Sequence, residues 1–342
     1  MNTEWKPPPG WRVIETLDAH AAGEPLRLIT KGLPRIPGDT ILKKRRYFRE
    51  NFDFLRTGLM WEPRGHADMY GAVLTEPVSE EGDFGVFFLH NEGYSTMCGH
   101  AVIALAKMTL DTGMVKKEGK NPEIKMDTPA GLVKAAAHRE EGKVKRASFL
   151  NVPCFVYLKD QKVQVPDIGW VSYDIAFGGA FYAFCRAEEL DVSLKPENCA
   201  RLIHLGRSIK KAVQNSVDIT HPLEEELGYL YGTIIIGPPE KSCNHSRNVC
   251  VFADGEVDRS PTGTGVSARA ALHYSRGELK KGEALVIESL IGTEFRVSVK
   301  EETRFGPYSS VVPEVSGSAS ITGTSRFCFD PDDPLKKGFL LR

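Results

Sequence analysis

Short apolar runs separated by turn residues dominate this chain and predict many strands with few helices. Two longer segments, 41–57 and 197–214, have the spacing of amphipathic helices. We expect strands at 11–17, 26–30, 71–75, 84–90, 124–127, 132–138, 144–150, 155–158, 169–175, 181–185, 228–236, 249–252, 285–291, 295–300, 309–315 and 319–324. Strands in runs around isolated helices favour an α+β fold over a doubly wound parallel sheet.

The stretch from Met97 to Leu105 predicts a third helix of a different kind. Cys98 is followed by Gly99 and His100, and then by apolar residues on every side of the expected helix. Such a helix should be buried, and it should end near Gly113. Its first N–H groups need partners, which favours an anion and the thiolate form of Cys98.

The stretch 258–272 repeats this arrangement. Asp258 is followed by Thr262, Gly263 and Thr264, which lead into a further helix that Gly277 can end. Aligning Thr262 with Cys98 gives an offset of 262 − 98 = 164 residues, close to half of the 342-residue chain. We therefore expect two equivalent halves, 1–166 and 167–325, each aiming a helix start at a shared cleft.

Composition narrows the possible partners. Lysine plus arginine number 44 against 45 aspartate plus glutamate, so the charge does not predict nucleic acid or an anionic membrane as partner. No apolar run reaches transmembrane length, and the polar start at 1–9 lacks a signal-peptide core. The seven cysteines contain no CxxC pair, which favours a reducing cytoplasm over a disulfide framework.

The two helix-start signatures resemble those of the proline racemase family, and the resemblance covers nearly the whole chain. It implies a diaminopimelate epimerase-like fold, in which two pseudo-symmetric domains each wrap a strongly bent mixed sheet around a buried helix, with the active site between them. It also implies that the tail 326–342 joins the first domain, and that the protein is a homodimer. Further family-like segments occur at 18–24, 62–69, 174–181 and 330–334.

The family carries cysteine in both signatures, whereas this chain has Cys98 in the first and Thr262 in the second. That combination resembles the members that dehydrate trans-3-hydroxy-L-proline, which would make the protein a hydro-lyase. The resemblance also implies that His100 and Asp258 hold the ring nitrogen of the substrate. A carboxylate can pair with a secondary ammonium, and an imidazole can donate or accept a hydrogen bond.

The residues themselves permit such chemistry without a cofactor. The carboxylate of an amino acid could accept N–H bonds at Gly99–His100 and at Gly263–Thr264, where negative charge develops when its α-proton is removed. Cys98 is the expected base, because a helix start should lower its pKa from about 8.5. We find no clustered metal-ligand spacing and no lysine in a cofactor motif.

Thr262 decides the expected reaction. A racemase needs a proton donor opposite its base, and threonine has no accessible pKa near neutrality. In trans-3-hydroxy-L-proline the hydroxyl and the α-hydrogen share one ring face, so Cys98 would face both. The Cys98 thiol or His100 would then protonate the leaving hydroxyl, and the resulting enamine would become Δ1-pyrroline-2-carboxylate.

Four other functions remain open on the sequence. The nearest is a proline racemase or hydroxyproline 2-epimerase with a different second acid, and a more distant one is a non-catalytic amino-acid-binding protein. A phosphate site at 260–265 lacks the usual lysine. A cysteine hydrolase using Cys98 and His100 is disfavoured, because residues two apart rarely adopt nucleophile–base geometry. We expect Arg259 to form a structural salt bridge, and His66 and Asp68 to lie in a turn.

Overall fold

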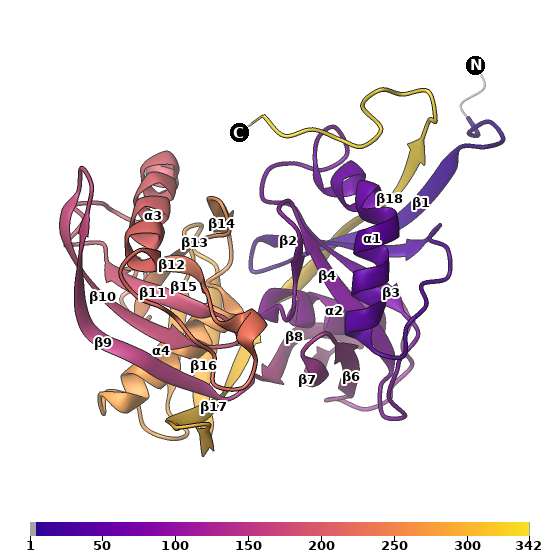
Figure 1. Cartoon of the computed structure of the whole chain (residues 1–342). Coiled ribbons are helices and arrows are strands. Elements are labelled where there is room, and N and C mark those ends of the chain that lie inside the picture. Colours follow the sequence, from indigo (N-terminus) through magenta and orange to yellow (C-terminus); the bar gives the residue numbers. More distant parts are fainter. Residues whose placement is uncertain (1–4, 342) are drawn as a thin grey trace.

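Two halves of similar construction lie side by side in the computed structural model, which describes residues 5–341 (Figure 1). The polar start predicted to lack a signal peptide lies partly outside the described residues. The first half contains β1 (Arg12–Ala21), β2 (Glu24–Lys31), α1 (Ile41–Met60), β3 (Tyr70–Thr75), β4 (Phe84–His90), β5 (Tyr94–Ser95), α2 (Gly99–Asp111), β6 (Glu123–Thr128), β7 (Gly131–Glu140) and β8 (Lys143–Leu150).

The second half continues the chain with the same kinds of element. It contains β9 (Cys154–Val165), β10 (Gly169–Phe177), β11 (Phe181–Arg186), η1 (Pro196–Asn198), α3 (Cys199–Gln214), η2 (Glu225–Leu227), β12 (Leu230–Gly237), β13 (Ser246–Phe252), β14 (Glu256–Asp258), α4 (Gly263–Ser275), β15 (Ala284–Glu288), β16 (Glu294–Phe305) and β17 (Tyr308–Gly317). The last strand is β18 (Ala319–Phe329). The predicted α+β class is confirmed.

Strand pairing repeats between the halves. In the first, β1 and β2 are antiparallel, β2 pairs with β3 in parallel, β4 pairs with β6 in parallel, and β6, β7 and β8 form a meander. In the second, β10, β11, β12, β13, β15, β16 and β17 repeat that order of orientations. The expectation of two equivalent halves therefore holds at the level of topology.

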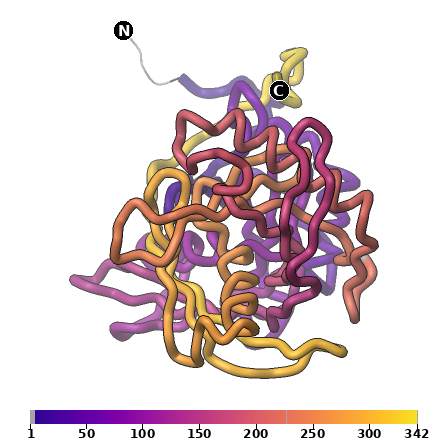
Figure 2. Tube along the Cα trace, turned by 90° about the vertical axis from the view of Figure 1, so that its left-hand side faces the viewer, coloured from indigo at the N-terminus to yellow at the C-terminus, as the bar shows by residue number. Residues whose placement is uncertain are grey.

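The last strand breaks the simple division of the chain. β18 pairs antiparallel with β1 from Arg12↔Phe329 to Ala21↔Ala319, and Phe339 bridges to Glu62. β9 pairs with β10 in the second half, so β18 takes in the first half the place that β9 takes in the second. Figure 1 shows the end of β18 beside the start of β1, and in both views the tail and the start of β1 lie at the same end of the molecule (Figures 1 and 2).

Two details of the sequence-based prediction are wrong. We expected the polar segment 162–166 to bridge the two halves, but residues 162–165 of it lie in β9 and pair with β10. The short strand β14, which ends at Asp258, was not predicted. Where the chain divides into domains remains a prediction.

Helices α2 and α4 lie inside the halves, as their apolar surroundings predicted. Of the thirteen residues in α2, only Lys107 and Asp111 are not buried. Thr112 caps the helix and Gly113 follows with φ +74°, while Gly277 follows α4 with φ +72°. Both glycines adopt the left-handed conformation that ends a helix at low cost.

A buried arginine joins several elements of the first half. Arg27 of β2 donates through Nε and Nη2 to the Asp18 carboxylate, and through Nη1 to the carbonyls of Leu59 and Arg64. Its guanidinium also lies 4.5 Å from the ring centroid of Phe327 in β18. One cation thus fastens β1, β2, the end of α1 and β18 together.

Replacing this cation should destabilise the protein. We expect Arg27→Leu to lower the free energy of unfolding by about 3 kcal/mol, because it leaves the Asp18 carboxylate and two carbonyls without their donor. Urea denaturation followed by circular dichroism measures the loss. Arg207→Leu is the control, since the Arg207–Asp254 pair is exposed and should contribute at most about 1 kcal/mol. Equal losses in the two variants would contradict the role of Arg27.

Candidate active site

The N-termini of α2 and α4 meet at two glycines. A Cβ on Gly99 would lie 3.0 Å from the Cα of Gly263, and a Cβ on Gly263 would lie 2.9 Å from the Cα of Gly99. Glycine at both positions therefore lets the two helix starts touch through their backbones. Each start presents unpaired N–H groups and a partial positive charge, so the two together form a site for an anion.

A small pocket of about 70 Å³ lies at this meeting point. All seven residues that the sequence singled out for the site line it: Cys98, Gly99, His100, Asp258, Thr262, Gly263 and Thr264. No lysine or arginine is among the described residues that line the pocket. A carboxylate there would have only neutral donors among the described lining residues, and the backbone N–H groups of the two helix starts are among these donors.

Sequence reasoning missed several residues that line the same pocket. Glu24 begins β2, and three tyrosines and a further cysteine come from strands of both halves: Tyr70, Tyr182, Tyr231 and Cys250. A family-like segment ends at Glu24, and this was the only signal that could have identified any of them. The tyrosines and Cys250 lie in apolar strand segments, and the pattern of such segments predicts that the residues are buried without indicating a role in a site.

Cys98 and His100 form a close pair. The Sγ atom of Cys98 lies 3.1 Å from Nδ1 of His100, and both residues are buried. The expectation that residues two apart would not meet in this way is wrong, because the helix begins at Gly99 and turns the imidazole back over the thiol. Tyr70 packs edge-on against the imidazole, with ring centroids 4.7 Å apart.

Burial controls the protonation of this pair. It raises the pKa of the Cys98 thiol well above its ordinary value, although the N–H of Ala101 at the helix start and the Tyr70 hydroxyl oppose the shift. The lowered pKa predicted for Cys98 is therefore wrong. Burial also lowers the pKa of His100 to about 3, against a hydrogen bond from its ring to the Pro25 carbonyl. At neutral pH the pair is a thiol beside a neutral imidazole.

Two carboxyl groups lie on another wall of the pocket. Asp258 accepts the N–H of Ser260 at 2.7 Å, and Glu24 accepts the N–H of Arg259 at the same distance. Burial raises the pKa of both carboxyls, and the neighbouring charge of Asp258 raises that of Glu24 further. The pocket is therefore suited to bind a cationic group that compensates their charge.

Arg259 points away from the pocket, as expected for a structural residue. Its Nη1 donates to the Asp68 carbonyl at 2.7 Å, and its Nη2 lies 3.5 Å from the Asp68 carboxylate. Asp68 has a left-handed φ of +61°, and neither it nor His66 lines the pocket. These contacts join the two halves across the back of the site.

Thr262 differs from Cys98 in backbone as well as side chain. Thr262 has φ +69° and ψ 99°, whereas Cys98 has an ordinary extended conformation with φ −148° and ψ 112°. The Thr262 side chain is buried beside the Asp258 carboxyl and the Cys250 thiol, and as a hydrogen-bonding neighbour it lowers the pKa of both groups against the rise that burial causes. The neighbouring Thr264 hydroxyl is hydrogen-bonded to the Tyr182 hydroxyl at 2.7 Å.

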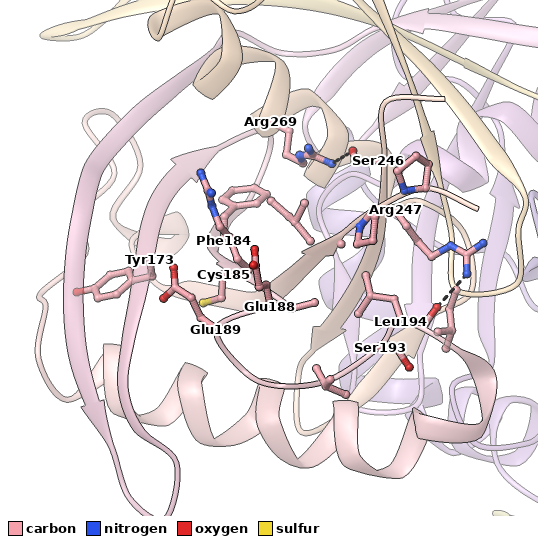
Figure 3. A pocket seen from close by; sticks show the side chains of 18 of the residues that line it. Tyr173, Phe184, Cys185, Glu188, Glu189, Ser193, Leu194, Ser246, Arg247 and Arg269 are labelled. Atoms are coloured by element: carbon pink, nitrogen blue, oxygen red, sulfur yellow. Dashed lines mark hydrogen bonds between the residues drawn. The ribbon is translucent and has the colours of Figure 1, made fainter. Parts of the chain in front are cut away.

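A wider open groove of about 1890 Å³ runs along the second half of the molecule, outside this pocket (Figure 3). None of the predicted site residues lines it. Among residues 5–341, no group of three or more histidine, cysteine or acidic side chains is placed to hold a metal ion. None of the helices described is long and apolar enough to cross a membrane.

Comparison with known proteins identifies relatives over almost the full length. The profile of a family described as proline racemase matches residues 16–340. A trans-3-hydroxy-L-proline dehydratase from Colwellia psychrerythraea is 47% identical, covering 99% of this chain and 96% of its own. A 3-hydroxyproline 2-epimerase from Burkholderia multivorans is 44% identical, covering 97% and 99%.

Solved structures agree with the sequence relatives. The crystal structure of a hydroxyproline epimerase from Agrobacterium vitis with bound trans-4-hydroxy-L-proline superimposes with a TM-score of 0.89 at 28% identity. The match covers 97% of this chain and 96% of that one. The fold is thus the two-domain epimerase-like α+β fold that the sequence predicted.

The protonation of Cys98 can be tested by alkylation. A raised pKa keeps the thiolate scarce until the pH approaches that value, so iodoacetamide should modify Cys98 slowly at pH 7 and faster with each step to about pH 10. Mass spectrometry of the Cys98 peptide measures the rate, with the exposed Cys243 as reference in the same sample. Rapid modification of Cys98 that levels off below about pH 8 would contradict the assignment.

Proposed function

Because the chain belongs to the proline racemase family, we propose that it is a hydro-lyase that converts trans-3-hydroxy-L-proline to Δ1-pyrroline-2-carboxylate and water. The observation that carries this proposal is the asymmetry of the pocket, where Cys98 and Thr262 stand at the two opposed helix starts. The relative from Colwellia psychrerythraea, named for this dehydration, supports the assignment.

The substrate zwitterion would bind between opposite charges. Its carboxylate would accept hydrogen bonds from the helix starts at Gly99–His100 and Gly263–Thr264, because no cationic side chain lines the pocket. Asp258 would hold the ring ammonium, which replaces the solvation that burial removes from its carboxylate. The helix dipoles would then stabilise the charge that grows on the substrate carboxylate as the α-proton leaves.

The Cys98–His100 pair can supply both proton transfers. The Cys98 thiol proton would pass to His100 Nδ1, across the 3.1 Å contact. The thiolate would take the α-proton, the C3–O bond would break as the Cα–C3 double bond forms, and the imidazolium would protonate the leaving hydroxyl. The pair returns to thiol and neutral imidazole, and the released enamine tautomerises to Δ1-pyrroline-2-carboxylate.

The low pKa of His100 suits this second role. An imidazolium with a pKa of about 3 is a strong acid, so it can protonate a poor leaving group. The role inferred from the family resemblance, contact of His100 with the ring nitrogen, would then be secondary to its contact with Cys98. Thr262 would orient the ligand through its hydroxyl, but it would not deliver a proton to the face of the substrate ring opposite Cys98.

Further parts of the proposal rest on the family resemblance and on composition. We expect the enzyme to work without a metal or organic cofactor, since two helix starts provide the positive potential that an enolate needs. A homodimer in the cytoplasm, with no nucleic-acid or membrane partner, completes the proposal. Light scattering of the purified protein would test the dimer.

The nearest alternative is a hydroxyproline 2-epimerase. The relative from Burkholderia multivorans, named a 3-hydroxyproline 2-epimerase, favours it. An epimerase requires a proton donor at the face that Thr262 occupies, and this is the reason for preferring dehydration. A proline racemase would need the same donor, and a non-catalytic amino-acid-binding protein would have no use for the Cys98–His100 pair.

Product analysis distinguishes these functions. Pure protein is incubated separately with trans-3-hydroxy-L-proline, trans-4-hydroxy-L-proline and L-proline. We expect a cyclic imine from the first and no inverted stereochemistry from any of them, because Thr262 cannot exchange a proton. Trapping with o-aminobenzaldehyde and chiral chromatography give the two readouts. Inverted product without imine would replace dehydration by epimerisation.

Cys98→Ser should lose nearly all turnover. A serine hydroxyl is a far weaker acid than a thiol and cannot form the required anion, so we expect kcat to fall by roughly 10³-fold or more. Cys250→Ser, at another cysteine on the same pocket, is the matched control and should retain most activity. A Cys98→Ser variant with nearly normal turnover would exclude the thiol as base.

Thr262→Cys should add a second exchangeable proton to the pocket. We expect this variant to exchange the α-hydrogen of L-proline with solvent deuterium or to gain epimerase activity, since a thiol would then lie at the face of the ligand opposite Cys98. Proton NMR in heavy water measures the exchange, with the wild-type protein as control. If the variant binds L-proline yet exchanges nothing, the two helix starts do not act on opposite faces of one ligand.

A further inference from the structure

Thr262 holds a backbone conformation that a β-branched residue rarely adopts. Its φ of +69° lies in the left-handed region, where such residues cost of order 1–3 kcal/mol and persist only if their surroundings hold them. Cys98, its counterpart at the other helix start, shows no such strain. Some contact in the second half must therefore fix the peptide before Thr262.

Three hydrogen bonds hold the backbone on either side of the strained residue. The N–H of Thr262 donates to the Ser260 hydroxyl at 3.1 Å, and its carbonyl accepts the N–H of Val266 at 2.8 Å. The carbonyl of Pro261 accepts Nδ2 of Asn248 at 3.2 Å. Asn248 is fully buried in β13, and among residues 5–341 its side chain is the only one that donates to that carbonyl.

Asn248 is itself held in one orientation by Arg269 of α4. Nη1 of Arg269 donates to Oδ1 of Asn248 at 2.9 Å and to the Ser246 hydroxyl at 2.8 Å. A guanidinium offers only donors, so the amide oxygen must face it and the amide NH2 must face Pro261. The Asn248 amide therefore donates to the Pro261 carbonyl and cannot flip to place its oxygen there.

The other end of this chain of contacts reaches the wide groove. Nη2 of Arg269 contacts Nε2 of His273 at 3.1 Å, and Nδ1 of His273 contacts the Glu278 carboxylate at 2.6 Å. Figure 3 shows Arg269 on the wall of this groove with its hydrogen bond to Ser246. Arg269 is 2% exposed, so burial lowers the pKa of its guanidinium, and the carboxylate of Glu278, which His273 bridges to it, opposes that shift.

We propose that Asn248 and Arg269 are positioning residues of the active site, which hold the Pro261–Thr262 peptide so that the start of α4 faces the substrate carboxylate. The inference rests on the proposed function and extends it to two residues that do not line the pocket. They act on catalysis through the backbone of Thr262, and losing them should weaken substrate binding more than it weakens the fold.

Asn248→Asp tests this assignment with little change in shape. The aspartate keeps an oxygen toward Arg269 but places a second oxygen, which repels, against the Pro261 carbonyl. We expect KM for trans-3-hydroxy-L-proline to rise about tenfold or more, as for the loss of one buried hydrogen bond, with a smaller fall in kcat. The dissociation constant of pyrrole-2-carboxylate, a planar carboxylate of similar size, should rise in parallel by calorimetry.

Asn91→Asp is the matched control. Asn91 is also buried, its oxygen accepts the N–H of Met69, and its Nδ2 donates to the Met60 carbonyl at 2.9 Å, but it does not line the pocket. Both variants should have a lower melting temperature than the wild type, but Asn91→Asp should keep KM within twofold of the wild-type value. A purely structural role of Asn248 would make the two variants indistinguishable in KM, and this result would overturn the proposal.

Arg269→Lys provides a second variant if Asn248→Asp does not fold. Lysine keeps the charge but not the two-pronged donor, so Asn248 should loosen and KM should rise by a smaller factor. Because both residues act through the contact with the Pro261 carbonyl, the double variant should raise KM no more than Asn248→Asp alone. If the fold-increases in KM of the two single variants multiply in the double variant, the two residues act independently and the proposal is contradicted. A wild-type enzyme that binds pyrrole-2-carboxylate but dehydrates nothing would instead refute the proposed function.

Discussion

The contact between two helix starts through Gly99 and Gly263 is the constraint on which the rest of the structure depends. Each carries a partial positive charge of about half an elementary unit, so bringing them together is unfavourable unless an anion lies between them. The two halves supply the necessary rigidity by burying α2 and α4 within their own layers of strands. This energetic preference for an anion is the physical basis of the carboxylate site that we propose in the pocket.

The halves are similar in topology and different in chemistry. One helix start carries a thiol paired with an imidazole on a relaxed backbone, whereas the other carries a hydroxyl on a strained backbone held by Asn248. On the proposed mechanism, the similarity would bring two sets of N–H donors to one ligand. The difference would confine proton transfer to one side of that ligand, which suffices for an elimination in which both leaving groups share a ring face.

Much of this could be predicted from the sequence. The glycine-led helices, the left-handed glycines Gly113 and Gly277 that follow their ends, and the repeated spacing depend on local rules, and the structure follows them. The raised pKa of the thiol could not be predicted, because it depends on how completely the site is buried. The closeness of Cys98 to His100 depends on the side-chain conformation of the imidazole, which the sequence pattern does not specify. Glu24 and Tyr70 were missed because tertiary pairing alone brings their strands to the pocket.

The pairing of β18 with β1 has a consequence for biosynthesis. The strands of the second half follow one another without interruption from β9 to β17, whereas the first half is completed only by the last strand to be made. On the ribosome, the half that is translated earlier must therefore wait with an open sheet edge at β1 until nearly the whole chain has emerged. Such an edge invites pairing with other nascent chains, so rapid release and chaperone cover during synthesis should matter more for the first half than for the second.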